Sequence, residues 1–378
     1  MRPERLDINK EMLIWAVRRC GQSVEQYAQK NPVFEKWISD EKKPTFKQLE
    51  DFAKSVYVPL GYLFLEEPPI ESVPIPMFRS GGGDVSLNVM DEVRTVQERQ
   101  EWLSAYLEEN DIEIPNYVGS KTIQTPIEET CQAIREILGL SLDWALREYS
   151  IGDAIRKLVT RMEDAGTMVC INNMVGNNIH RKISVSDCRG FALIDRNAPF
   201  VFVNGGDAQV AQTFTLIHEF AHVLIGYESG VGDEDSIVNS SENERYCDKV
   251  AAYFLVPEGL FRQLWTGDTD EIYANLAKRF KVSRYTIARR AAELHLISSV
   301  RQFQLFNTWK NEPVQHIERN GHPTFRTLAL RRISPTFMIH LSNAAHTSKI
   351  LYLDAYRLAG LKGDTFHNVV GDNKQIAR

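Results

Sequence analysis

Two histidines and a glutamate stand close together in one apolar stretch of the chain, residues 215–226 (TLIHEFAHVLIG). His218 and His222 are four residues apart, and on an α-helix residues i and i+4 lie one turn apart on the same face. Both imidazoles can therefore reach one cation, while Glu219 lies beside them without having to act as a ligand. A catalytic zinc takes three protein ligands and keeps one position for water, whose proton a nearby carboxylate accepts. The motif predicts hydrolytic metal chemistry, although His-Glu-x-x-His also occurs by chance in helices that bind no metal.

A third metal ligand is expected from the next helical pattern, residues 242–255. It offers three carboxylates, Glu242, Glu244 and Asp248. Glu244 continues the apolar stripe of this helix, whereas Glu242 points away from it. The spacing favours Glu244 as the ligand, with Asp248 as the second candidate and Glu242 as the third. The alternative role for Glu244 is a capping box that begins at Ser241.

The elements that must position these residues indicate an α+β fold that is mostly helical. Helical spacing dominates, but short runs rich in β-branched and aromatic residues follow Gly166 and indicate a small sheet. The run FVFVN (200–204) precedes the motif helix, expected at 207–226, where a zincin would have its edge strand, and we expect it to hold a substrate backbone by edge addition. Four regions are predicted: a helix-turn-helix-like bundle with its connector (1–78), a helical linker (79–165), a zincin-like peptidase core (166–300) and a C-terminal helical domain (301–378).

Three segments together, GFALIDRNAPFVFVN, FTLIHEFAHVLIG and ENERYCDKVAAYFLVP, resemble the ImmA/IrrE family of bacterial zinc metallopeptidases. Cys247 and Val250 stand where the family usually has alanine and phenylalanine, which affects the shape of the pocket but removes no ligand. The resemblance implies a folded regulator as the substrate, typically a helix-turn-helix repressor that is cut at one site to release its genes. It also implies the site: Zn²⁺ on His218, His222 and Glu244, with Glu219 as the general base.

Composition is that of a soluble protein of more than one domain. The chain has 378 residues, of which 43% are hydrophobic and 25% charged, and this length exceeds what one ordinary core accommodates. No apolar run reaches the length of a membrane span, and the N-terminus has no signal-peptide pattern. The five cysteines are far apart and form no Cys-x-x-Cys pair. These features predict a cytoplasmic protein with reduced thiols and no membrane contact.

Charge is distributed unevenly along the chain. Residues 270–378 contain 17 Lys and Arg against 8 Asp and Glu, whereas residues 1–69 are balanced at 11 against 11. The acidic excess therefore lies in the middle, around the metal motif. The basic C-terminal part has two equally good interpretations: contact with nucleic acid, or docking on the acidic middle of its own chain.

The N-terminal residues 8–65 resemble the Xre-type helix-turn-helix domain that often precedes ImmA/IrrE peptidases. Its expected second helix, VFEKWISDE, is short and carries both signs of charge, so operator DNA and a protein partner are equally good interpretations. No DNA-binding residue can be assigned. A second stretch, LAKRFKVSRYTIARRAAEL (276–294), also has a helix-turn-helix pattern, with a structural role favoured over nucleic-acid contact.

The Xre–peptidase arrangement also resembles regulators and antitoxins encoded beside a toxin gene. In this alternative function the chain acts by binding operator DNA and a cognate toxin, and the metal site is auxiliary. A third interpretation is a stress sensor whose site is masked until an effector binds, with SGGGD (80–84) as a hinge. The sequence leaves a homodimer open.

Overall fold

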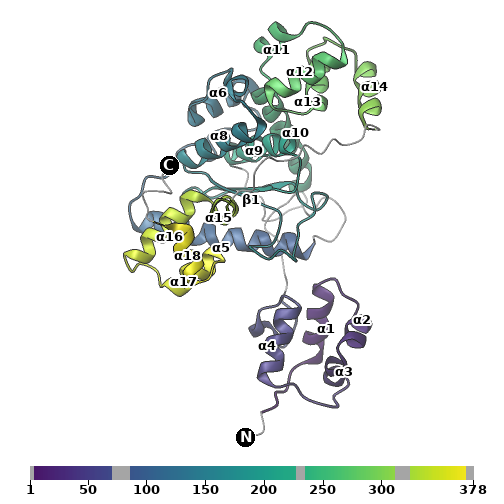
Figure 1. Cartoon of the computed structure of the whole chain (residues 1–378), viewed down its shortest axis with the longest axis vertical. Coiled ribbons are helices and arrows are strands. Elements are labelled where there is room, and N and C mark those ends of the chain that lie inside the picture. Colours follow the sequence, from purple (N-terminus) through teal and green to yellow (C-terminus); the bar gives the residue numbers. More distant parts are fainter. Residues whose placement is uncertain (1–3, 70–85, 227–234, 311–323, 372–378) are drawn as a thin grey trace. The chain divides into compact units, whose positions relative to one another are not determined.

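A computed structural model describes residues 4–69, 86–226, 235–310 and 324–371, with side chains in the helix after residue 234 described from Glu242 onward. The chain divides into two compact units, Met1–Val73 and Pro74–Arg378 (Figure 1). The predicted hinge at 80–84 lies outside the described residues. Among the described helices, none is both long and apolar enough to cross a bilayer.

The smaller unit is a bundle of short helices around an aromatic core. Tyr27, Phe34 and Phe52 form this core, with ring centroids 5.0 Å apart for Tyr27 and Phe34 and 5.5 Å apart for Phe34 and Phe52. Ser23 and Thr45 cap the starts of two helices by accepting hydrogen bonds from backbone N–H groups three residues ahead. The elements are α1 (Lys10–Arg19), α2 (Val24–Lys30), α3 (Pro32–Ile38), α4 (Phe46–Ser55) and the 3-10 helix η1 (Leu60–Phe64).

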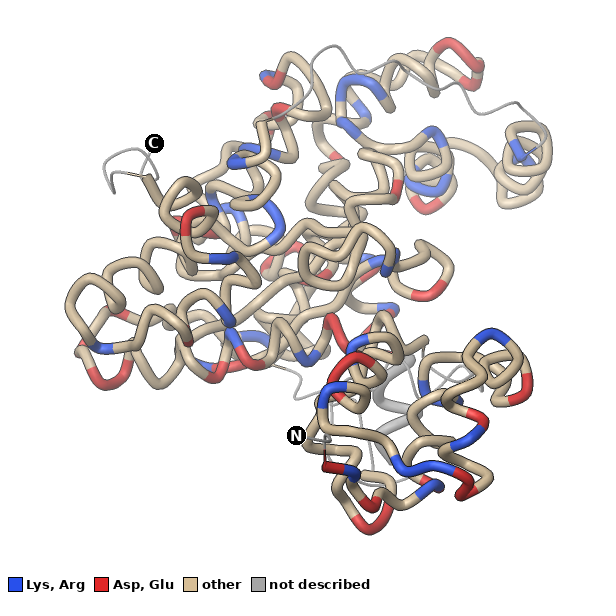
Figure 2. Tube along the Cα trace, turned by 60° about the horizontal axis from the view of Figure 1, so that its bottom comes forward, with Lys and Arg blue, Asp and Glu red and all other residues tan. Residues whose placement is uncertain are grey.

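Helices α2 and α3 are joined by Asn31 alone, which ends one helix and begins the other. A helix-turn-helix reader of DNA has a turn of three or four residues at this place. The exposed side chains of α3 include Val33, Glu35 and Lys36, and both signs of charge are interspersed along this unit in Figure 2. The described residues of this unit therefore form a helical bundle without a basic recognition helix.

The larger unit is built on a three-stranded sheet whose strands are fully buried. β1 (Met168–Asn172) pairs in parallel with β3 (Phe200–Asn204), and β2 (Gly190–Leu193) pairs antiparallel with β3 on its other side. The order β1-β3-β2 makes β3 the central strand. The expectation that residues 200–204 receive a substrate by edge addition is therefore wrong, because both edges of β3 are paired within the sheet.

Helices cover both faces of this sheet, as Figure 1 shows. α8 and α9 pack on one face, and α5, α15 and α16 lie on the other. A buried carboxylate, Glu163, ties the two layers together: it accepts hydrogen bonds from Val169 N (2.7 Å), Thr336 N (2.8 Å) and Ser334 Oγ (3.0 Å). The bounds of these helices are α5 (Leu87–Glu109), α8 (Ile151–Asp164), α9 (Gln209–Ile225), α15 (Phe325–Ile333) and α16 (Pro335–His346).

The remaining helices surround this layered centre. α10 begins at Asp235, seven residues before the helical pattern expected at 242–255, so Ser241 lies inside the helix instead of capping it. The bounds are α6 (Ile127–Leu138), α7 (Trp144–Arg147), α10 (Asp235–Leu255), α11 (Glu258–Leu264), α12 (Asp270–Phe280), α13 (Arg284–Glu293), α14 (Ser299–Lys310), α17 (Tyr352–Ala359) and α18 (Gly363–Val370).

Candidate metal centre

The C-terminal end of α9 is fixed close to the histidine motif by a neighbouring loop. The backbone N–H groups of Gly119 and Lys121 donate to the carbonyls of Val223 and Leu224, at 3.1 and 2.9 Å. The helix ends at Gly226 in the left-handed conformation (φ 60°), and a Cβ there would lie 2.4 Å from Gly119 Cα. These contacts satisfy carbonyls that a helix end otherwise leaves without partners. The loop therefore fixes the last turn of α9, which contains His222.

Helix α10 brings a carboxylate to the histidines because it packs closely along α9. Ala221 on α9 and Cys247 and Ala251 on α10 are small and fully buried. Small side chains let the two helix backbones approach. One turn before Cys247, Glu244 then reaches the face of α9 that carries His218.

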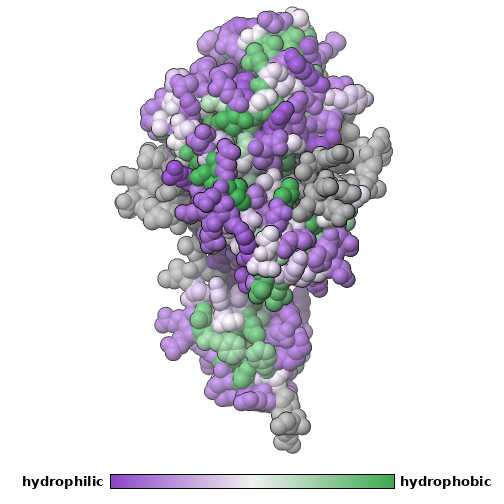
Figure 3. All heavy atoms as spheres, turned by 90° about the vertical axis from the view of Figure 1, so that its left-hand side faces the viewer, coloured by the Kyte–Doolittle hydropathy of each residue, from purple (hydrophilic) through white to green (hydrophobic). Residues whose placement is uncertain are grey.

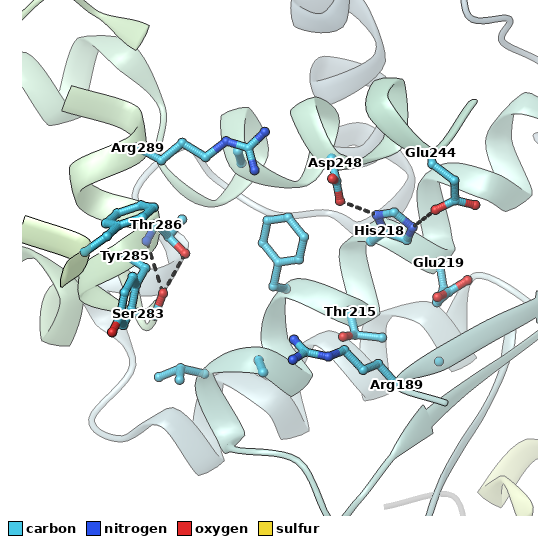
Figure 4. A pocket seen from close by; sticks show the side chains of 16 residues that line it. Arg189, Thr215, His218, Glu219, Glu244, Asp248, Ser283, Tyr285, Thr286 and Arg289 are labelled. Carbon is cyan, nitrogen blue, oxygen red and sulfur yellow. Dashed lines mark hydrogen bonds and ion pairs between the residues drawn. The ribbon is translucent and has the colours of Figure 1, made fainter. Parts of the chain in front are cut away.

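Three of the predicted site residues converge with their donor atoms in mutual contact. His218 Nε2 lies 3.1 Å from Glu244 Oε2 and 3.2 Å from His222 Nε2. His222 Nε2 lies 3.3 Å from Glu244 Oε1. The three side chains offer donor atoms that all lie within 4.8 Å of one another. Figure 4 shows His218 between the carboxylates of Glu244 and Asp248.

This donor set fits zinc. Nitrogen and oxygen ligands of tetrahedral zinc lie at about 2.0–2.1 Å from the ion, which places them about 3.3 Å from one another. The separations of 3.1, 3.2 and 3.3 Å between the donor atoms match that edge length. Two imidazoles and one carboxylate are also a ligand set of catalytic zinc sites, where the fourth position stays open.

Asp248 and Glu242, the other two candidate ligands, lie outside this cluster of donor atoms. Asp248 Oδ1 lies 3.1 Å from His218 Nδ1, the nitrogen that faces away from the donor cluster, without the alignment of a hydrogen bond. A carboxylate behind a metal-binding imidazole orients the ring and increases its basicity. Glu242 is exposed and lines a separate surface hollow with Arg245 and Lys249.

Glu219 lies in a narrow space between α9 and strand β2. Its side chain is buried and has no hydrogen-bond partner among the described residues. Gly190 opens this space, because a Cβ on Gly190 would lie 2.9 Å from Glu219 Oε1, 2.4 Å from Thr215 Cγ2 and 2.9 Å from Phe202 O. Glycine inside a strand often marks such a close approach. The glycine at the first position of GFALID is the sequence signal of this close approach.

The titratable groups of the site fall into two kinds: Glu244 and His218 form a charged pair, and Glu219 is a buried acid. Burial raises the pKa of Glu244, but hydrogen bonds from His218 and His222 outweigh it and lower that pKa to about 2. Burial lowers the pKa of His218, but Asp248 and Glu244 outweigh it and raise that pKa to about 10. Without a cation, His218 therefore carries a proton at neutral pH. Burial raises the pKa of Glu219, which suits a group that must take up a proton.

A cavity of about 420 Å³ opens from the metal-binding residues towards α13. Thr215, Glu219 and Glu244 line its inner end (Figure 4). The outer wall comes from a part of the chain that the sequence did not connect with the site: Tyr285 and Arg289 on α13. This helix is the second half of the helix-turn-helix-like segment 276–294. Its exposed face therefore borders the cavity.

Two family models match parts of the chain. Residues 162–292 match the model of peptidase family M78, described as an IrrE N-terminal-like domain. This range contains α9 and α10, with His218, Glu219, His222 and Glu244, and so supports the resemblance to the ImmA/IrrE family. Residues 333–371 match a second family, described as a domain of unknown function.

Beyond the family models, the chain has only a distant similarity to the structure described below. A search of curated proteins finds no match. A solved structure, a Mycobacterium tuberculosis transcriptional regulator, is similar at 16% sequence identity and a TM-score of 0.28, and covers 51% of this chain. The chain spans about half the length of that regulator, 51%.

Proposed function

We propose that this chain is a zinc-dependent endopeptidase. The observation that carries the proposal is the mutual contact of His218, His222 and Glu244, with the buried acid Glu219 on the same helix as the two histidines. The match of residues 162–292 to a peptidase family supports the same chemistry. Zinc held by the three ligands would supply a Lewis acid and would lower the pKa of a bound water to about 7.

The chain's own residues then account for the proton transfers and the orientation of the site. Glu219 accepts the proton of the attacking water at a carboxylate oxygen and delivers it to the nitrogen of the leaving amine. Its burial favours the protonated form that this relay needs. Asp248 stands behind the His218 ring and keeps Nε2 directed to the donor cluster.

The substrate backbone is proposed to add to strand β2. Asn204 N donates to Arg189 O, so these two residues form a hydrogen-bonded pair of the antiparallel ladder. By alternation, Gly190 and Ala192 direct their backbone N–H and C=O groups to the outer edge. Gly190 also borders Glu219. An extended peptide on this edge would therefore pass directly beside the proposed base.

The ImmA/IrrE resemblance supplies the substrate class: a regulatory protein, specifically a helix-turn-helix repressor whose cleavage changes gene expression. The experiment compares the purified chain with Glu219→Gln, which keeps the ligands but removes the proton acceptor. We expect one zinc per chain in both proteins. Cleavage of a repressor encoded beside this gene, or of casein, should fall 10²–10⁴-fold in the variant.

Glu242→Gln is the matched control, since Glu242 is an exposed carboxylate on α10 outside the cavity. Its activity should equal that of the wild type. A chain without stoichiometric zinc, or undiminished cleavage by Glu219→Gln, would refute the peptidase.

A further inference from the structure

The cavity beside the metal-binding residues has a chemical character of its own. Away from the histidines its wall is mostly apolar and aromatic, with the side chains of Val210, Ala211, Phe214, Ala252 and Phe306. Such a lining, at about 420 Å³, suits a large apolar side chain.

Two arginines reach into this cavity from opposite sides, as Figure 4 shows. Arg189 comes from the residue before β2, and its side chain extends below Thr215. It is exposed and makes no ion pair or hydrogen bond through its side chain among the described residues. Arg289 comes from α13 and points to the side on which Asp248 and His218 lie.

The second arginine is held by a single contact with a neighbour on its own helix. Arg289 Nε lies 3.5 Å from Glu293 Oε1, and about half of its side chain, 52%, is exposed. A carboxylate one turn away steadies the stem of such a side chain, while the planar guanidinium keeps further donors for a ligand. Both arginines therefore offer positive charge to whatever occupies the cavity.

Three carboxylates of the chain would repel an acidic ligand in this cavity. Glu244 contacts both histidines, and Asp248 lies at an ion-pair distance from His218. Glu219 lies farther in, beside Gly190. These three acids gather at the inner end of the cavity, whereas Arg289 belongs to the outer wall on α13. The positive charge of Arg289 therefore enters the cavity from a different wall than the three acids.

We propose that this cavity selects an acidic peptide segment, in which a large apolar side chain fills the aromatic part and a neighbouring Asp or Glu binds Arg189 and Arg289. The proposal rests on the proposed peptidase function and names its substrate class. Guanidinium groups bind carboxylates through paired hydrogen bonds, which gives geometric selectivity as well as attraction. The exposed side of α13 then serves peptide recognition and not the major groove of DNA.

The test measures binding by short peptide hydroxamates, whose hydroxamate group takes the open position on zinc. Two series place Leu-Asp, Leu-Asn or Leu-Lys before or after the hydroxamate. Each is titrated calorimetrically into the zinc-loaded full chain at 50 and 200 mM salt. The variants are Arg189→Gln, Arg289→Gln, their combination and Arg289→Glu. The matched control is Arg279→Gln, an exposed arginine of α12 that lines a different hollow.

In one of the two series, the Asp ligand should bind the wild type at least tenfold more tightly than the Asn ligand, with a smaller ratio at high salt. The ratio should approach one in the double variant and stay unchanged in Arg279→Gln, while Arg289→Glu should favour the Lys ligand. Equal binding of Asp and Asn ligands by the wild type would overturn the acidic selectivity and leave the peptidase standing. Failure of the zinc-loaded wild type to bind any hydroxamate would refute the open metal site, and the selectivity with it.

Discussion

Gly190 and Glu219 lie so close together that no side chain larger than hydrogen fits between strand β2 and the proposed base. A Cβ at position 190 would lie 2.9 Å from Glu219 Oε1 and 2.4 Å from Thr215 Cγ2. The edge of β2 that is proposed to bind the substrate therefore lies directly beside Glu219, the carboxylate that is proposed to transfer the proton of the attacking water.

Gly190→Ala should reduce turnover because Glu219 and Thr215 must move away from the new methyl group. We expect kcat/KM to fall 10- to 100-fold, since a misplacement of about 1 Å at a reacting group has effects of this size. Zinc content should be unchanged, because the ligands are on α9 and α10. Gly259→Ala is the control: a Cβ there meets no atom within 4 Å. Equal activities of the two variants would contradict the steric role of Gly190.

Asp248→Asn should weaken zinc binding without unfolding the protein. The carboxylate 3.1 Å from His218 Nδ1 favours the ring orientation and basicity that a ligand needs. Loss of such a partner usually costs 10- to 100-fold in metal affinity. Competition with a chelator measures the affinity, and circular dichroism checks the fold. Glu242→Gln, on the same helix but facing away from the site, should bind zinc like the wild type; a similar loss there would point to net charge instead of orientation.

Zinc binding should release a proton and become tighter as pH rises. Asp248 and Glu244 raise the pKa of His218 to about 10 in the metal-free protein, against the effect of burial. The proton therefore stays on His218 up to that pH, and a metal ligand must lose it. Between pH 7 and 9 the apparent Kd should fall about tenfold per pH unit for this one proton. Calorimetry in buffers of different ionisation enthalpy counts the released protons, and a count of zero would contradict a protonated His218.

Local signals in the sequence were sufficient to name the three donor residues that the structure brings together. The i, i+4 spacing of His218 and His222 is a property of one helix, and Glu244 continues the apolar stripe of the next helix. The order of the strands is different, because it depends on pairing between segments far apart in the chain. For that reason the sequence indicated FVFVN as a strand but could not show that it is the central one.

The residues that form the outer wall of the cavity could not be predicted from the sequence either. Arg289 comes to the cavity from about 70 residues beyond His218. The helix-turn-helix pattern of α12 and α13 favoured a structural role over nucleic-acid contact, and nothing in it connected this segment with the site. The start of α10 at Asp235 also differs from the start expected at residue 242, because the Ser and Asn residues before that position have low helix propensity and show no helical pattern.

Glu163→Gln should destabilise the larger unit. The carboxylate is buried and accepts hydrogen bonds from the backbone of β1, from Ser334 and from the first turn of α16. A glutamine amide has one oxygen for these donors and directs its NH₂ group at the rest, so we expect a loss of about 1–3 kcal/mol in the free energy of unfolding. The urea midpoint measures this. Asp164→Asn, next to it in sequence and exposed, should change the midpoint little; an equal shift would argue against the buried contacts.

The smaller unit should not bind DNA in a salt-sensitive way. Its residues 1–69 carry 11 basic and 11 acidic side chains, and Asn31 alone separates α2 from α3. Phosphate contacts by Lys and Arg supply most nonspecific affinity and make binding fall steeply with salt. Fluorescence anisotropy of the full chain with its own upstream DNA, at 50 and 200 mM salt, should therefore show weak binding that changes little. A loss of affinity by 10³-fold or more over this range would instead indicate six or more phosphate contacts. That result would support the regulator or antitoxin alternative, and Lys36→Gln on the exposed side of α3 would then locate the contact.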